Sequence, residues 1–250
     1  MKKILLSILL STFLLAATPE QVDRYLSISN ADEQLVELET QFSRMQTNLN
    51  SISKEEDIQS YDMQLLSIRF KEYLQKHLSE DEMDEILNLY KNVILLQFVS
   101  ATAEEISDPK EAEAYVKKIE ADPESHVRID LVKKISHEMY SKESMVLMFD
   151  NLMKPLLENA QEDNKLDPEM LKKSREAYIK RMIKEAENET LYATRDFTIE
   201  ELEALEKIAR EPVIDKESKA VFGAIAYALE EFFLSLAKRY DIKKHQPDNH

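Results

Sequence analysis

The five histidines are the first residues to consider for metal or acid–base chemistry. A di-iron bundle places a Glu three residues before a His, and a zinc hydrolase places two His four residues apart around a Glu. Neither spacing occurs at positions 77, 126, 137, 245 and 250. We therefore expect these histidines to lie on the surface or to pack in loops. The sequence predicts no metal site, no cofactor site and no cofactor.

The sequence also offers no convincing pair of a nucleophile and a base for nucleophilic catalysis. Ser136 and His137 are adjacent, so on a helix their side chains diverge by about 100° and cannot hydrogen-bond as a nucleophile and its base must. The 49 acidic residues make any chosen carboxylate pair uninformative, because a general acid also needs an apolar pocket that raises its pKa. No catalytic residue is predicted, and a hydrolase with paired carboxylates is kept only as a minor alternative.

A calcium loop is conceivable in EDNKLD, from Glu162 to Asp167. A twelve-residue loop that begins at Asp163 would need a glycine at its centre and a bidentate Glu at its last position. The glycine is missing, and the last position is Ser174. A solvated loop that ends in Asp167, the cap of the next helix, explains the same residues.

Two segments could form binding surfaces. KKSREAYIKRMIKEAE, from Lys172, concentrates basic residues on an acidic chain, and a basic amphipathic helix can lie on anionic lipid. An ordinary solvated face is the preferred interpretation. MVLMFDNLMKPLL, from Met145, is rich in side chains that adapt to an apolar ligand or a partner helix. Core filling is the default there, with a kink or break near Pro155.

The elements that carry these segments are predicted to be helices throughout. Gly223 is the only glycine, so tight hairpins and phosphate-binding loops are effectively excluded. Apolar residues recur at spacings of three and four, which predicts an all-α fold. The segment from Ala220 to Tyr240 is apolar on most faces and rich in small residues, so we expect it to lie at the centre of the core.

Helix starts can be located from capping residues. Thr18-Pro19, Asp108-Pro109, Asp122-Pro123 and Asp167-Pro168 each place a capping side chain before a proline. Asn30 with Glu33, and Ser53 with Glu56, have capping-box spacing.

Two further starts resemble each other. FTIEEL, from Phe197, and LSEDEM, from Leu78, each combine a capping box with a hydrophobic staple. Thr198 pairs with Glu201 in the first, and Ser79 with Glu82 in the second. Neighbouring residues also match at the same offset, which favours an internal duplication over convergence of two helix starts. We predict two related helical lobes at 18–106 and 128–240, a linking helix at 107–127 and a mobile tail at 241–250.

The N-terminus predicts export. Residues 1–17, MKKILLSILLSTFLLAA, have the layout of a secretory signal peptide, with cleavage expected near Ala17. The apolar run is too short to span a membrane. The chain has no cysteine, so neither disulfides nor a lipid-attached cysteine are expected. The net charge of −16 becomes −18 without Lys2 and Lys3, which disfavours nucleic acid and anionic membrane surfaces as partners.

The segment YATRDFTIEELEALEKIAREPV resembles an exported bacterial family called domain of unknown function 2059. That family has a Phe-Thr-x-x-Glu-Leu helix start, followed by Phe-Tyr and a Ser-Pro-x-Gly turn. The resemblance runs from Arg128 onward and is fainter in the first half. Ile208 and Ala209 replace Phe-Tyr, and no Gly follows Pro212-Val213. The resemblance implies a periplasmic helical protein and supplies no catalytic residue.

These patterns favour a periplasmic, noncatalytic protein that binds a protein partner or another envelope component. One alternative is a carrier that holds a lipid or another apolar small molecule in a groove between the lobes. A second alternative is the envelope hydrolase with paired carboxylates. The sequence does not decide the oligomeric state.

Overall fold

The protein is all-α, as its glycine count and apolar spacing predict. The structure is a computed structural model that describes residues 15–52, 61–103, 109–159 and 167–239. Within these ranges strand pairing is limited to one isolated antiparallel bridge, between Ala16 and Ser79. The predicted tail at 241–250 and most of the predicted signal peptide lie outside the described residues.

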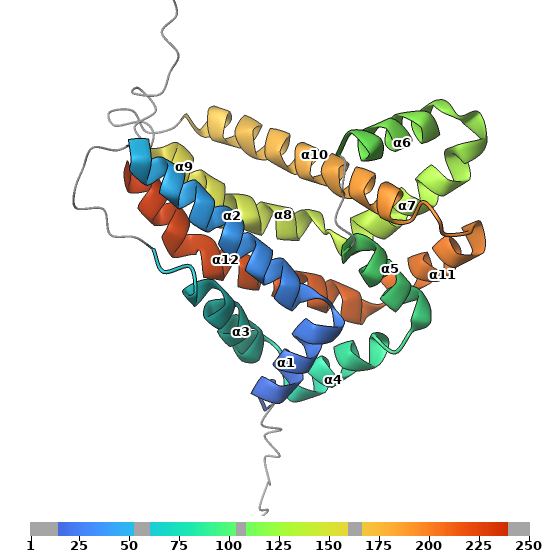
Figure 1. Cartoon of the computed structure of the whole chain (residues 1–250), viewed down its shortest axis with the longest axis horizontal. Coiled ribbons are helices and arrows are strands. Elements are labelled where there is room, and N and C mark those ends of the chain that lie inside the picture. Colours follow the sequence, from blue (N-terminus) through green and yellow to red (C-terminus); the bar gives the residue numbers. More distant parts are fainter. Residues whose placement is uncertain (1–14, 53–60, 104–108, 160–166, 240–250) are drawn as a thin grey trace, which may run out of the picture.

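In the described ranges, five helices come from the first half of the chain (Figure 1). They are α1 (Pro19–Ile28), α2 (Ala31–Ile52), α3 (Leu65–His77), α4 (Glu80–Leu89) and α5 (Val93–Ala103). The remaining elements are α6 (Pro109–Ala121), the 3₁₀ turn η1 (Pro123–Ser125), α7 (His126–Met139), α8 (Lys142–Met148), the π-helical turn η2 (Phe149–Met153), α9 (Lys154–Asn159), α10 (Pro168–Ala193), α11 (Ile199–Ala209) and α12 (Pro212–Arg239).

Both predicted capping boxes are confirmed. The Ser79 hydroxyl accepts from the Glu82 N–H at 3.2 Å, and the Glu82 carboxylate accepts from the Ser79 N–H at 3.0 Å. Thr198 and Glu201 form the same reciprocal pair at 3.2 and 2.7 Å. α4 and α11 therefore begin where the sequence places them.

The other predicted starts have mixed outcomes. Thr18 caps α1 and forms a capping box with Gln21. Asp167 caps α10, and Asp122 caps the 3₁₀ turn η1 that leads into α7. α6 begins at Pro109, although Asp108 lies outside the described residues, as does the start expected at Ser53 with Glu56.

Asn30 precedes α2 as predicted, but its backbone conformation is not that of a cap. Its φ is 58°, in the left-handed region, whereas a capping residue is normally extended. Asn tolerates this region better than most residues, so Asn30 turns the chain sharply between α1 and α2. The capping-box interpretation of Asn30 with Glu33 is wrong for this reason.

A break also occurs where Pro155 requires one. α8 gives way to the π-helical turn of Phe149–Met153, and α9 then begins one residue before the proline. A proline inside a helix removes one backbone donor and its ring crowds the preceding turn, and a π-turn is one way to absorb that mismatch.

The core surrounds α12. This helix packs against α3, α4, α7, α8, α9 and η2. α2 runs beside it in Figure 1, and the ring centroids of Phe42 on α2 and Phe232 on α12 are 5.1 Å apart. Ala224, Ala226 and Ala228 are fully buried. Such small side chains let neighbouring helices approach closely, so the predicted central position of this segment is confirmed.

One buried cluster contains residues from both predicted lobes, including Leu26 and Phe70 from the first and Leu205 and Phe232 from the second. The halves also interleave, because α12 packs on α3 while α5 packs on α10 and α11. The predicted lobes thus share one core. Their origin by duplication stays a prediction.

Candidate functional site

The most unusual polar group in the described core is the carboxyl of Glu217, on α12. It accepts a hydrogen bond from the Tyr25 hydroxyl of α1 at 2.7 Å and another from the Tyr90 hydroxyl at the end of α4. The two tyrosine rings meet edge to face at 5.9 Å between centroids. Only 9% of Glu217 is exposed. Three helices that are distant in the sequence therefore meet at one carboxylate.

Burial raises the pKa of Glu217, because a charged carboxylate loses its hydration inside the core. The two tyrosine hydrogen bonds act in the opposite direction and only partly offset this effect. Burial also raises the pKa of both tyrosines well above the usual value. Burial therefore favours the protonated form of all three groups, which suits a structural junction.

This junction does not have the geometry of a paired-carboxylate hydrolase. The other buried glutamate in the described residues, Glu206 on α11, forms an ion pair with Arg210. Glu217 itself is closed off by two tyrosines. A hydrolytic pair needs two carboxylates that converge on an accessible space. Neither glutamate offers that arrangement.

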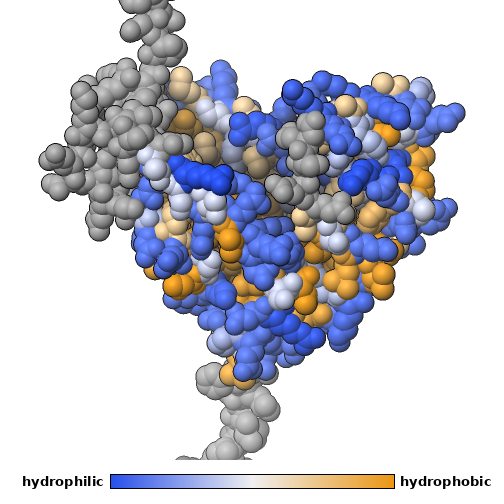
Figure 2. Space-filling view, viewed as in Figure 1, coloured by the Kyte–Doolittle hydropathy of each residue, from blue (hydrophilic) through white to orange (hydrophobic). Residues whose placement is uncertain are grey.

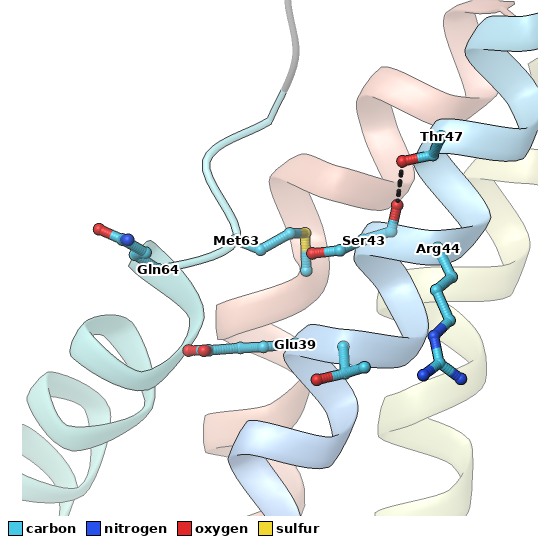
Figure 3. A pocket seen from close by; sticks show the side chains of 7 residues that line it. Glu39, Ser43, Arg44, Thr47, Met63 and Gln64 are labelled. Carbon is cyan, nitrogen blue, oxygen red and sulfur yellow. Dashed lines mark hydrogen bonds between the residues drawn. The ribbon is translucent and has the colours of Figure 1, made fainter.

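An open groove lies between α2 and the start of α3. Its volume is about 590 Å³, and it is lined by Glu39, Thr40, Ser43, Arg44, Thr47, Met63 and Gln64. The α2 residues recur at helical spacing, so they form one stripe along that helix. Figure 3 shows Glu39 and Ser43 projecting toward α3 and Met63, while Arg44 projects from the other side of α2.

Some polar groups of this groove are already engaged within the fold. Glu39 accepts from the Ser67 hydroxyl at 2.6 Å. The hydroxyls of Thr40 and Thr47 donate to carbonyls of their own helix, at 2.9 Å in both cases. By contrast, the side chains of Arg44 and Gln64 form no hydrogen bond or ion pair within the described part of the chain. Their donors face solvent and can bind a polar ligand.

The histidines with described positions have local roles. His77 stacks on Tyr73, with ring centroids 3.7 Å apart, and His126 contacts the carbonyl of Pro123 at 2.7 Å. His137 lies 3.0 Å from Glu187 of α10 and is exposed, whereas the neighbouring Ser136 is buried. Ser136 and His137 thus diverge as predicted. Among the described residues, no group of three or more His, Asp or Glu side chains is arranged to hold a metal ion.

In the segment EDNKLD, where a solvated loop is preferred to a calcium loop, residues 162–166 lie outside the described residues and Asp167 caps α10 as expected. The basic segment lies on α10, and several of its cations pair with acidic side chains: Arg175 with Asp150 at 3.8 Å, and Lys184 with Glu120 at 2.7 Å. In the methionine-rich segment, Met145, Phe149 and Leu152 are buried. Core filling, the default interpretation of that segment, is confirmed.

The described surface also carries exposed apolar side chains on α5. Val93 is 66% exposed and Leu96 is 40% exposed, while Leu95 and Phe98 on the opposite face are buried. Figure 2 shows apolar side chains gathered over this part of the molecule. Among the described residues, no single helix is long and apolar enough to cross a membrane; α4 and α5 meet that criterion only together, and they are bent by 85°.

Sequence reasoning missed the Glu217 junction and the groove. Glu217 has the same sequence surroundings as many exposed glutamates, and both tyrosines are far away along the chain. The groove had a weak signal in the alternation of hydroxyl and charged residues from Glu39 to Thr47, which also fits a solvated helix face.

The fold and the groove define a class: an all-α protein with an open groove between α2 and the start of α3 whose described lining is mainly polar. Comparisons with known proteins add no closer assignment. No family model matches the chain, and neither a curated protein nor a solved structure matches it. The resemblance to domain of unknown function 2059 therefore stays a prediction.

Proposed function

We propose that this is an exported, periplasmic, noncatalytic protein that binds a polar segment of another envelope protein in the groove between α2 and α3. The observation that carries the proposal is the largely polar lining of the groove, with Arg44 and Gln64 at its edges, where neither side chain forms a hydrogen bond or ion pair within the described part of the chain. A polypeptide segment offers backbone carbonyls and side-chain carboxylates that both groups recognise.

The lining of the groove favours a polar occupant over the lipid of the carrier hypothesis. A site for an apolar molecule is mostly lined by hydrophobic side chains, and Met63 is the only hydrophobic residue among the described residues that line this groove. In the methionine-rich segment that could have served a carrier, Met145, Phe149 and Leu152 are packed into the core. The groove therefore supports binding of a protein segment best.

Site-specific photocrosslinking in intact cells tests the proposal. A photoreactive amino acid at Thr40, in the groove, is expected to capture a defined partner, whereas the same group at exposed Glu203 of α11 is not. Arg44→Glu should abolish the Thr40 crosslink. Lys172→Glu, an equal charge change on exposed α10, should leave it intact. A crosslink that is equal at both sites, or insensitive to Arg44→Glu, would contradict the proposal.

A further inference from the structure

Residues 15–17, at the end of the predicted signal peptide, are hydrogen-bonded to the folded domain, although Leu15 is 64% exposed. The Ala17 N–H donates to the Leu78 carbonyl at 2.9 Å, and the Glu80 N–H donates to the Leu15 carbonyl at 2.8 Å. These two bonds form the antiparallel bridge between Ala16 and Ser79. Ala17 is only 4% exposed. The segment is thus docked as a short strand against the turn that precedes α4.

The next residue, Thr18, is hydrogen-bonded to Gln21 in the first turn of α1. Its N–H donates to Gln21 Oε1 at 2.9 Å, and its hydroxyl accepts from the Gln21 N–H at 3.2 Å. The Gln21 amide in turn donates to the Glu80 carbonyl at 3.1 Å and to Asp84 Oδ1 at 2.7 Å. The Ala17–Thr18 peptide bond therefore lies between a bridged strand and a capped helix start, and both contact the beginning of α4.

A protease that binds its substrate as an added strand uses the backbone edge of the residues around the cleaved bond. In the folded protein Leu78–Glu80 already occupy the edge of Leu15–Ala17. Cleavage then requires prior opening, and its rate follows the population of the open form when closing is fast. Docking and cleavage are mutually exclusive states of the same three residues.

We propose that the fold protects its own processing site: the leader is removed at the Ala17–Thr18 bond only while Leu15–Ala17 is undocked from Leu78–Glu80. This inference depends on the export part of the proposed function. The step is peptide hydrolysis by a leader peptidase with water, which leaves a carboxylate on Ala17 and an ammonium on Thr18. Removal of Leu15–Ala17 frees the Glu80 N–H and the Leu78 carbonyl, so α4 keeps its own cap but loses its strand partner.

Glu80→Pro tests the proposal with little other change. Glu80 is the first residue of α4, where proline is well tolerated, and Ser79 before it is already extended, with ψ at 163°. The substitution therefore removes the N–H that binds Leu15 and keeps the helix. Lys142→Pro is the matched control, because Lys142 is the exposed first residue of α8 and follows an extended Ser141.

The purified full-length chains and a synthetic peptide of residues 1–25 are incubated with a detergent-solubilised bacterial leader peptidase, and intact mass gives the cut site and rate. We expect the folded Glu80→Pro chain to be cut at least tenfold faster than the folded wild type or the Lys142→Pro chain, and the peptide to be cut fastest. Gln21→Ala removes the side-chain contacts with Thr18, Glu80 and Asp84 without changing the backbone. It should also accelerate cleavage, and it replaces Glu80→Pro as the test if that variant does not fold.

The outcomes separate the two proposals. If the peptide is cut after Ala17 and the folded wild type is cut as fast as both variants, the protection proposal is wrong. The prediction of a cleavable leader would still hold. Cleavage at a bond before Leu15 would also overturn it, since the docked residues would then remain on the mature protein. If the peptide is not cut at all, the prediction that residues 1–17 are a leader is wrong, and the export proposal fails with it.

Discussion

Tyr73 of α3 occupies the space that any side chain at position 223 of α12 would need. A Cβ built on Gly223 would lie 2.7 Å from both Cε1 and Cζ of the Tyr73 ring, closer than real carbon contacts allow. The Tyr73 ring is also held by His77, stacked at 3.7 Å, and by Tyr227 at 5.7 Å between centroids. The only glycine of the chain is thus where α3 crosses α12.

We therefore expect Gly223→Ala to destabilise the protein. Alanine is favoured over glycine in a helix interior by about 1 kcal/mol, but overpacking at a helix crossing costs about 1–3 kcal/mol, so a net loss should remain. Urea unfolding measures it. In the double variant with Tyr73→Ala, the Gly223→Ala cost should disappear and the propensity gain should emerge. A destabilisation that persists without Tyr73 would show that the crossing is not its cause.

The Glu217 junction predicts a particular dependence of stability on pH. Because the pKa of Glu217 is raised in the folded protein, between the unfolded pKa and the folded pKa the folded protein binds more protons than the unfolded chain. The contribution of this group to the free energy of unfolding therefore falls as pH rises through that window. Other carboxylates add their own terms, so the comparison must be made against a variant.

Glu217→Gln keeps an acceptor for Tyr25 and Tyr90 but cannot ionise. We expect its stability to exceed that of the wild type increasingly as pH rises above the unfolded pKa of Glu217 and the gain to level off above the raised folded pKa, measured by urea unfolding at each pH. Each unit of raised pKa corresponds to about 1.4 kcal/mol at the upper end. Glu217→Leu should instead be destabilised at every pH, since each stranded tyrosine hydroxyl costs about 1–3 kcal/mol. If the difference in free energy of unfolding between Glu217→Gln and the wild type does not change with pH, the raised pKa of Glu217 does not contribute to stability in this way.

The capping boxes of α4 and α11 predict losses of similar origin but different context. Thr198→Ala and Ser79→Ala should each cost about 1 kcal/mol in urea unfolding. The Ser79 change should cost more, because its partner Glu82 also binds Lys216 of α12 at 3.2 Å. Thr198→Ser retains the accepting oxygen and is the control. Equal stability of Thr198→Ala and Thr198→Ser would mean that the Thr198 hydroxyl contributes nothing.

Arg128 fixes the connection between α10 and α11. Its guanidinium, from α7, donates to the Thr194 carbonyl at 2.8 Å and to the Phe197 carbonyl at 2.5 Å. Arg128→Met should lower stability by about 1.5–3 kcal/mol, typical for hydrogen bonds from a charged donor. Arg128→Lys should recover only part, because one ammonium cannot reproduce the two-pronged geometry.

Amide hydrogen exchange provides the local check on Arg128. Faster exchange in Arg128→Met should be concentrated at the connection from Thr194 to Thr198. Lys134→Met, a charge removal on the exposed side of the same helix, should leave that connection unchanged. Uniformly faster exchange over the whole chain would instead indicate a global loss of stability without a specific role at the connection.

The sequence by itself determined the local structure. The chain has a single glycine, which predicted helices throughout. The capping residues Thr18, Ser79 and Thr198 located helix starts, because a cap satisfies N–H groups only three residues away. Pro155 predicted a break for an equally local reason. Asn30 was the exception. Its spacing to Glu33 suggested a cap, but the reversal between α1 and α2 needed a left-handed residue instead.

Tertiary structure alone decided which residues meet. Glu217 binds tyrosines that are 192 and 127 positions away, and nothing near it in the sequence distinguishes it from the other acidic residues. The groove likewise exists only because α2 and α3 lie side by side with Met63 between them. Caps and helical periodicity act within a few residues, whereas burial of a carboxylate, the space beside a glycine and the docking of Leu15–Ala17 depend on how helices pack.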